Sequence, residues 1–112
     1  MGNKDRTSKY IFKVLWSKTS LGIAINEIYK TNYDAPLTTF YFWPREDGWK
    51  LLKAELDSKP WMLEKSKLEI LNGYTTIINY WLKNLNKDIK ISSFNFKELD
   101  LNIDILAINS LN

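Results

Sequence analysis

Residues 37–61, LTTFYFWPREDGWKLLKAELDSKPW, change from the pattern of a strand to the pattern of a helix at Pro44. Aromatic and β-branched residues fill the stretch before this proline, a composition typical of a β-strand near 37–43. Proline is tolerated in the first turn of a helix, and the two acidic residues that follow suit the positive end of the helix dipole. The sequence therefore predicts a helix near 45–57, with three apolar residues at helical spacing: Trp49, Leu52 and Leu56.

A second, longer helix is predicted near 63–84, beyond the break at Ser58-Lys59-Pro60. Its apolar residues fall on two adjacent stripes, which together make the wide apolar face of a helix packed on a sheet. One stripe holds Leu68, Leu71, Thr75, Ile78, Leu82 and Leu85, and the other holds Ile70, Tyr74, Ile77 and Trp81. We expect the two helices to bury six large side chains: Trp49, Leu52, Leu56, Leu71, Ile78 and Trp81.

Upstream of the quoted stretch, two further segments have the composition and alternation of strands. They lie near 9–16 and 22–29, on either side of a turn-like break, and we expect them to form a hairpin. Residues 31–36 are expected to be a loop. The order of the elements predicts an α+β domain: a three-stranded antiparallel sheet followed by two helices packed on one face.

The two ends of the chain are expected to lie outside this domain. Residues 1–8 read as a flexible basic arm, 9–85 as a single α+β domain, and 86–112 as an extended tail. Apolar residues alternate with polar ones around 99–105, so the tail has room for one short edge strand. With its many Asn and Lys residues, the tail should become ordered mainly by contact with a partner.

The composition excludes several kinds of chemistry. The 112 residues include no Cys and no His, so disulfides, Cys/His zinc sites and Cys or His nucleophiles are ruled out. The carboxylates that lie near one another fall on predicted helix surfaces beside Lys, where ordinary ion pairs are expected. No glycine-rich phosphate loop and no apolar run as long as a membrane span is present. We therefore expect no catalytic residues, no metal, no cofactor, no small-molecule substrate and no membrane contact.

Binding remains as the function, and the charge distribution indicates where. The net charge is only +3, but basic residues dominate the first 30 positions and the stretch after the long helix. Phosphates are bound mainly by Lys, Arg and backbone amides, with aromatic side chains stacking on exposed bases. The alternative is a solvated surface and, for Arg45, a helix-surface ion pair. The candidate RNA-binding residues are Lys4, Arg6, Lys9, Lys13, Lys18, Arg45, Lys83, Lys87 and Lys90.

The segment 36–61 also carries a family resemblance. Tyr41-Phe42-Trp43-Pro44-Arg45, followed at this spacing by Ser58-Lys59-Pro60-Trp61, closely resembles the signature of the plastid-specific ribosomal protein 3 family. The resemblance extends over about residues 9–82 and departs from the family at Gly48, where Ala is expected. It implies a structural component of the small (30S) subunit of the plastid ribosome that binds ribosomal RNA and neighbouring ribosomal proteins. It also implies a ribosome-bound location in the chloroplast stroma.

Two other classes of function stay open at this point. One is a regulatory translation factor that binds the plastid small subunit transiently. The other is a small enzyme that uses carboxylates alone, which would need a deep cleft around Glu46, Asp47 or Glu55. If the chain is complete from Met1, it carries no obvious transit peptide, and it would then be made inside the organelle.

Overall fold

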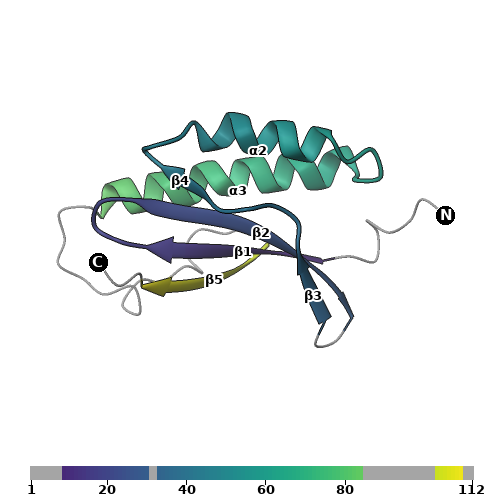
Figure 1. Ribbon diagram of the computed structural model, residues 1–112, viewed down its shortest axis with the longest axis horizontal. Helices are drawn as coiled ribbons and strands as arrows, with labels where there is room; N and C mark the ends of the chain where they lie inside the picture. The colour runs from purple at the N-terminus through teal and green to yellow at the C-terminus, as the bar shows by residue number, and fades with distance from the viewer. Residues whose placement is uncertain (1–8, 31–32, 85–102, 110–112) are drawn as a thin grey trace.

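The computed structural model describes residues 9–30, 33–84 and 103–109, which form a mixed sheet covered on one face by two helices (Figure 1). The strands are β1 (Lys9–Trp16), β2 (Leu21–Lys30), β3 (Tyr33–Pro36), β4 (Tyr41–Trp43) and β5 (Asp104–Asn109). The helices are α2 (Gly48–Asp57) and α3 (Glu64–Lys83). The α+β class and the position of both helices on one side of the sheet agree with the sequence analysis.

The sheet differs from the predicted three antiparallel strands. Its order is β3-β2-β1-β5, and β4 also pairs with β2. The pairs β1–β2, β2–β3 and β2–β4 are antiparallel, as expected. The fifth strand, β5, pairs with β1 in parallel, so the sheet is mixed. This edge strand comes from the segment expected to be a tail; the other predicted parts of the tail, and the arm at 1–8, lie outside the described residues.

The predicted third strand is split in the structure. Residues near 37–40 leave the strand conformation because the chain crosses the backbone of Ile25 there. The N–H groups of Leu37 and Thr38 donate to the Ile25 carbonyl at 2.9 and 3.2 Å, and the Thr38 hydroxyl accepts from the Ile25 N–H at 3.1 Å. Regular pairing with β2 resumes only at Tyr41. The expected loop at 31–36 instead contains β3, whose pairing with β2 the sequence pattern did not show.

The first helix begins at Gly48 rather than near residue 45. Asp47 caps it, because its Oδ1 accepts a hydrogen bond from the Lys50 N–H at 3.2 Å. Glu46 lies before the helix, and its Oε1 accepts from the Phe42 N–H at 2.7 Å. Residues 44–47 therefore form a turn that joins β4 to α2. The peptide bond between Trp43 and Pro44, at the start of this turn, is cis.

The core lies between the sheet and the helices, and most of the predicted core residues occupy it. Five of the six are buried: Leu52, Leu56, Leu71, Ile78 and Trp81. The expectation for Trp49 is wrong, since its side chain is 42% exposed. The buried stripe of α2 runs through Gly48, Leu52 and Leu56, four residues apart, and this register turns Trp49 outward.

The small size of Gly48 lets α2 approach α3. A Cβ atom at this position would lie 1.9 Å from the hydroxyl oxygen of Tyr74, so only glycine fits without movement. The Tyr74 hydroxyl is buried and has no hydrogen-bond partner among the described residues. Burial, and then the charges of Asp47 and Glu46, raise the pKa of Tyr74 to about 12.

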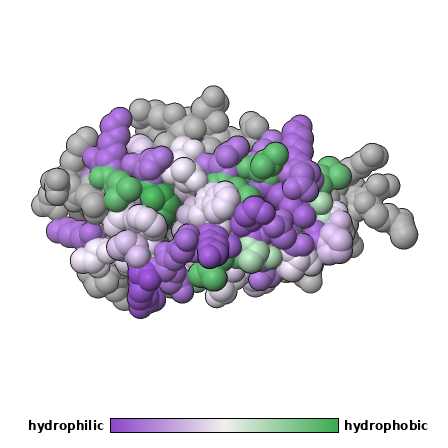
Figure 2. Space-filling view, turned by 90° about the horizontal axis from the view of Figure 1, so that it is seen from above, coloured by the Kyte–Doolittle hydropathy of each residue, from purple (hydrophilic) through white to green (hydrophobic). Residues whose placement is uncertain are grey.

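The two apolar stripes of α3 are not equally buried. Ile70, Tyr74, Ile77 and Trp81 face the core, whereas Leu68 and Leu82, at the edge of the other stripe, are 54% and 42% exposed. Seen from the helix side, apolar residues lie in separate groups among polar side chains (Figure 2). No helix within the described ranges combines the length and the apolar character needed to cross a bilayer.

Candidate nucleic-acid interface

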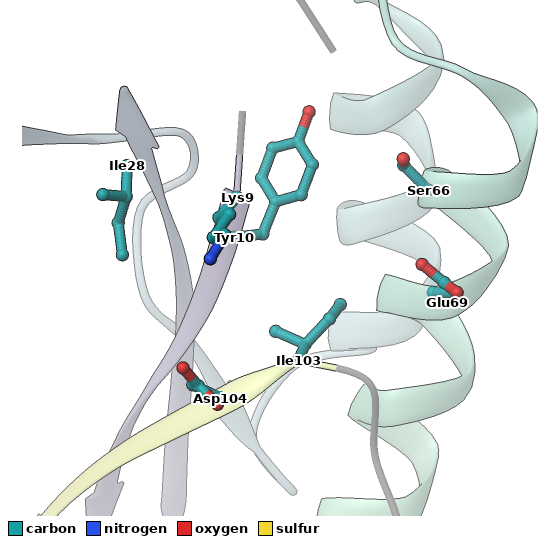
Figure 3. A pocket seen from close by; sticks show the side chains of 7 residues that line it. All are labelled: Lys9, Tyr10, Ile28, Ser66, Glu69, Ile103 and Asp104. Atoms are coloured by element: carbon teal, nitrogen blue, oxygen red, sulfur yellow. The ribbon is translucent and has the colours of Figure 1, made fainter. Parts of the chain in front are cut away.

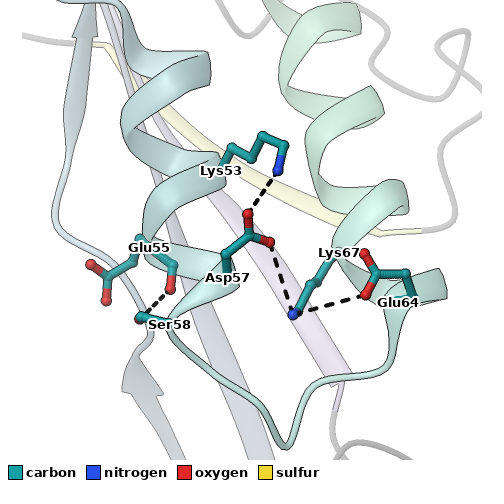
Figure 4. Close-up of polar contacts among 6 residues, drawn as sticks. All are labelled: Lys53, Glu55, Asp57, Ser58, Glu64 and Lys67. Carbon is teal, nitrogen blue, oxygen red and sulfur yellow. Dashed lines mark hydrogen bonds and ion pairs between the residues drawn. The ribbon is translucent and has the colours of Figure 1, made fainter.

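The carboxylates of the helices are occupied by neighbouring lysines. Lys53 Nζ lies 2.7 Å from Asp57 Oδ2, and Lys59 Nζ lies 2.8 Å from Glu55 Oε2. Lys67 Nζ lies 4.0 Å from a second oxygen of Asp57 and 4.0 Å from Glu64 (Figure 4). The hydrogen bond from Lys53 lowers the pKa of Asp57, so this carboxyl is held ionised. These are ion pairs on and beside the helix surface, and they engage Lys53, Lys59 and Lys67.

The structure places five of the nine candidate RNA-binding residues. Lys9, Lys13, Lys18, Arg45 and Lys83 are described, whereas Lys4, Arg6, Lys87 and Lys90 lie outside the described residues. Lys9, Lys18, Arg45 and Lys83 are exposed, and Lys13 is half-buried. Within the described ranges, Lys9, Lys13, Arg45 and Lys83 form no ion pair with a carboxylate.

Lys9 and Lys18 do not lie close together. They stand at opposite ends of β1, which at about 3.3 Å per residue separates them by roughly 25 Å. Lys9 lines a hollow of about 350 Å³ that also contains the carboxylates of Glu69 and Asp104 (Figure 3). Carboxylates repel phosphate, so this hollow is a poorer phosphate site than the other end of the sheet.

The other end of the sheet brings together three of the candidates. Lys18 lies in the β1–β2 turn, which is tightened by hydrogen bonds between Ser17 and Ser20. The indole N–H of Trp81 donates to the Ser17 carbonyl at 2.8 Å and so fixes the last turn of α3, with Lys83, against this turn. A hollow of about 470 Å³ lies between the same turn and the segment after β4; its lining is Thr19, Ser20, Phe42, Pro44 and Arg45.

Arg45 is positioned over an aromatic ring. Its guanidinium carbon lies 5.4 Å from the centre of the Phe42 ring, within the range of a cation–π contact. The ring of Phe42 in turn lies against Gly22, where a Cβ atom would approach it to 2.6 Å. The neighbouring carboxylate of Glu46 is held by the Phe42 N–H, not by Arg45. The predicted alternative for Arg45, a helix-surface ion pair, is absent from the described residues.

Phe40 and Phe42 were not singled out as surface residues from the sequence. Both are only half-buried. The register of β4 places Phe42 on the face of the sheet opposite the helices, and Phe40 lies beside it. A signal was present in β2, where the small residues Gly22 and Ala24 occupy alternate positions and leave space above the strand. The sequence alone did not show that β2 pairs with β4, so it could not show that this space is filled by the Phe42 ring.

Comparison with known proteins shows consistent similarities. The family model described as "Plastid and cyanobacterial ribosomal protein (PSRP-3 / Ycf65)" matches residues 37–84. A small ribosomal subunit protein cS23 from Gracilaria tenuistipitata var. liui is 42% identical over 94 residues, which cover 83% of this chain and 94% of that protein. A probable cS23 from Synechococcus sp. (strain JA-2-3B'a(2-13)) is 47% identical over 65% of this chain and 73% of its own length. The cS23z protein of Arabidopsis thaliana is 35% identical over 69% of this chain and 46% of its own length.

Proposed function

The chain belongs to the plastid and cyanobacterial ribosomal protein family PSRP-3/Ycf65, and on that premise we propose that it is a structural component of the small subunit of the plastid ribosome. The observation that carries the proposal is the 42% sequence identity with the Gracilaria protein, over 94% of that protein's length. The role is non-enzymatic: of the three carboxylates that acid–base chemistry would need, Glu55 is paired with Lys59, Glu46 accepts from the Phe42 N–H, and Asp47 caps α2.

We infer that the partners are small-subunit ribosomal RNA and neighbouring small-subunit proteins, and that the protein is ribosome-bound in the plastid stroma. Lys18, Arg45 and Lys83 gather at one end of the sheet, near the surface aromatic Phe42. Phosphate binding needs cations that carboxylates do not already neutralise. Arg45 and Lys83 form no ion pair among the described residues, whereas Lys53, Lys59 and Lys67 do, which favours this end over the helices. Lys4, Arg6, Lys87 and Lys90 remain further candidates from the sequence.

Charge-removing variants test the RNA contacts. Replacing Lys18, Arg45 and Lys83 together by Ala should weaken association with salt-stripped small subunits. It should also reduce the slope of log affinity against log salt by about 2–3, since each phosphate contact contributes roughly 0.7–0.9. The control variant replaces Lys50, Lys53 and Lys65, which removes the same charge from the helices and should leave the slope nearly unchanged.

A second variant tests the basic arm, which the sequence predicts to supply most of the salt-dependent affinity. It replaces Lys4, Arg6, Lys9 and Lys13 by Ala and is compared with the same helix control. Equal losses from the control and from both basic sets would show that attachment depends on overall charge. No loss from either basic set would show that attachment runs through protein neighbours instead.

A further inference from the structure

The face of the sheet opposite the helices carries its own cluster of side chains. Along β1, Phe12, Val14 and Trp16 are buried toward the helices, so the residues between them point the other way. In the register of the sheet, Leu15 pairs with Gly22, and Gly22 pairs with Phe42. Paired residues point to the same side, so Leu15 and Phe42 share this second face. Both described helices lie on the first face (Figure 1).

Two aromatic rings form the centre of this cluster. Phe42 lies against Gly22, which lacks the Cβ atom that would displace the ring. Phe40 packs beside it, with ring centres 6.2 Å apart and an interplanar angle of 31°. Because Phe42 rests on the backbone of a paired strand, its ring is held in place before any ligand arrives.

Two hollows flank the rings, and each contains one cation. The first, of about 250 Å³, is lined by Lys13, Val14, Leu15, Phe40 and Leu106. The second, of about 470 Å³, contains Phe42, Pro44 and Arg45 beside the hydroxyls of Thr19 and Ser20. The contact between Phe40 and Phe42 joins the two hollows into one surface. We call this surface the aromatic face: Lys13, Leu15, Phe40, Phe42, Arg45 and Leu106.

The charge of the aromatic face is positive. None of the residues lining either hollow is acidic, in contrast to the hollow at Lys9, which contains Glu69 and Asp104. Lys13 and Arg45 form no ion pair among the described residues, and Glu46 is engaged by the Phe42 N–H. A ligand of this surface must therefore be an anion that also has flat apolar faces.

We propose that the aromatic face binds an unpaired segment of ribosomal RNA. This inference rests on the proposed function and specifies which form of RNA is recognised. Bases in a duplex are stacked on each other and cannot reach an aromatic ring, whereas unpaired bases stack on aromatic side chains and on guanidinium planes. One base enters the hollow beside Pro44 and stacks at Phe42 and Arg45. The neighbouring phosphates of the RNA backbone are bound by Arg45 and Lys13. An acidic protein segment fits the charge but leaves the rings without a stacking partner.

Two conservative variants isolate the stacking. Phe42→Leu keeps an apolar contact with Gly22 but removes the ring, and Arg45→Lys keeps the charge but removes the planar guanidinium. Trp49→Leu is the matched control, because it removes an exposed aromatic ring from α2 on the other side of the sheet. Thermal melts of the full chain confirm that each variant is folded before it is used.

The test adds the wild-type protein or a variant to small subunits that lack it, and then probes the ribosomal RNA with base-specific chemical reagents. Retention of the protein on the subunit is measured in the same samples. Added wild-type protein and Trp49→Leu should be retained and should protect the same unpaired nucleotides. Phe42→Leu and Arg45→Lys should still be retained, with protection of at least one of these nucleotides reduced by about 5-fold or more.

The two proposals fail in different ways. Retention of the wild type without any change at unpaired nucleotides would overturn the stacking inference and leave the ribosomal role standing. The same holds if Phe42→Leu protects as well as the wild type. If the wild type is not retained at all, the ribosomal role itself is wrong, and the inference falls with it.

Discussion

Gly48 is a residue at which the packing of α2 on α3 leaves no room for a single added atom. Ala is a better helix former by about 1 kcal/mol, which by itself would favour Gly48→Ala. The added Cβ, however, would lie 1.9 Å from the Tyr74 hydroxyl oxygen and 2.8 Å from its ring carbon. Overpacking of this kind costs about 1–3 kcal/mol, so we expect a net loss of stability in denaturant unfolding.

Tyr74→Phe provides the control for this prediction. It removes the buried hydroxyl, which has no partner among the described residues, and should by itself leave stability unchanged or slightly higher. In the double variant, the cost of Gly48→Ala should be smaller than in the wild-type background. A cost that is the same in both backgrounds would show that the hydroxyl is not the obstacle.

The difference between buried and exposed apolar residues of the helices gives a second test at the residue scale. Ile78 and Leu52 are almost fully buried, so Ile78→Ala or Leu52→Ala should cost roughly 2–5 kcal/mol of unfolding free energy. Leu68 carries the same kind of side chain on the same helix as Ile78 but is 54% exposed, so Leu68→Ala should cost less than about 0.5 kcal/mol. Similar losses at Ile78 and Leu68 would show that the buried face of α3 is assigned wrongly.

Among the elements, β5 is the strand that makes the sheet mixed rather than antiparallel. Its parallel pairing with β1 places Ile103 in the core and Ile105 and Ala107 against it. Amides of β5 that donate to β1 should therefore exchange slowly with solvent in the free protein, close to the rate of amides in the β1–β2 hairpin. Ile103→Ala should speed their exchange, because it removes the buried anchor at the start of the strand. Rapid exchange throughout 104–109 in the wild type would instead support a tail ordered only by its partner.

The elements also show what the sequence alone could predict. The strands β1 and β2 and the helix α3 have long, regular patterns, and their ends were predicted to within a residue or two. β3 has only four residues and pairs with the preceding strand β2 through an irregular register, and β5 pairs with the distant strand β1. Local composition therefore did not identify β3 or the parallel pairing of β5. Trp49 was misplaced because Gly48 carries no hydrophobic signal, although its position on the buried stripe sets the register of α2.

At the scale of the whole molecule, the sequence identified the basic residues but not their arrangement. Lys9 and Lys18, close in sequence, are separated by the length of β1, whereas Lys18, Arg45 and Lys83, distant in sequence, lie at one end. Only the fold brings the latter together, through the Trp81–Ser17 hydrogen bond and the hollow between the turn and Arg45. The aromatic face depends on the same long-range pairing, since it requires β2 and β4 side by side.

The central claim is that the protein is a structural component of the small subunit, and its copy number there tests this most directly. Quantitative mass spectrometry of purified, salt-washed plastid small subunits should find close to one copy per subunit, in constant ratio to other small-subunit proteins across growth conditions. A copy number well below one, or one that changes with conditions while other small-subunit proteins stay constant, would contradict the claim. It would identify the protein as a transient regulatory factor instead.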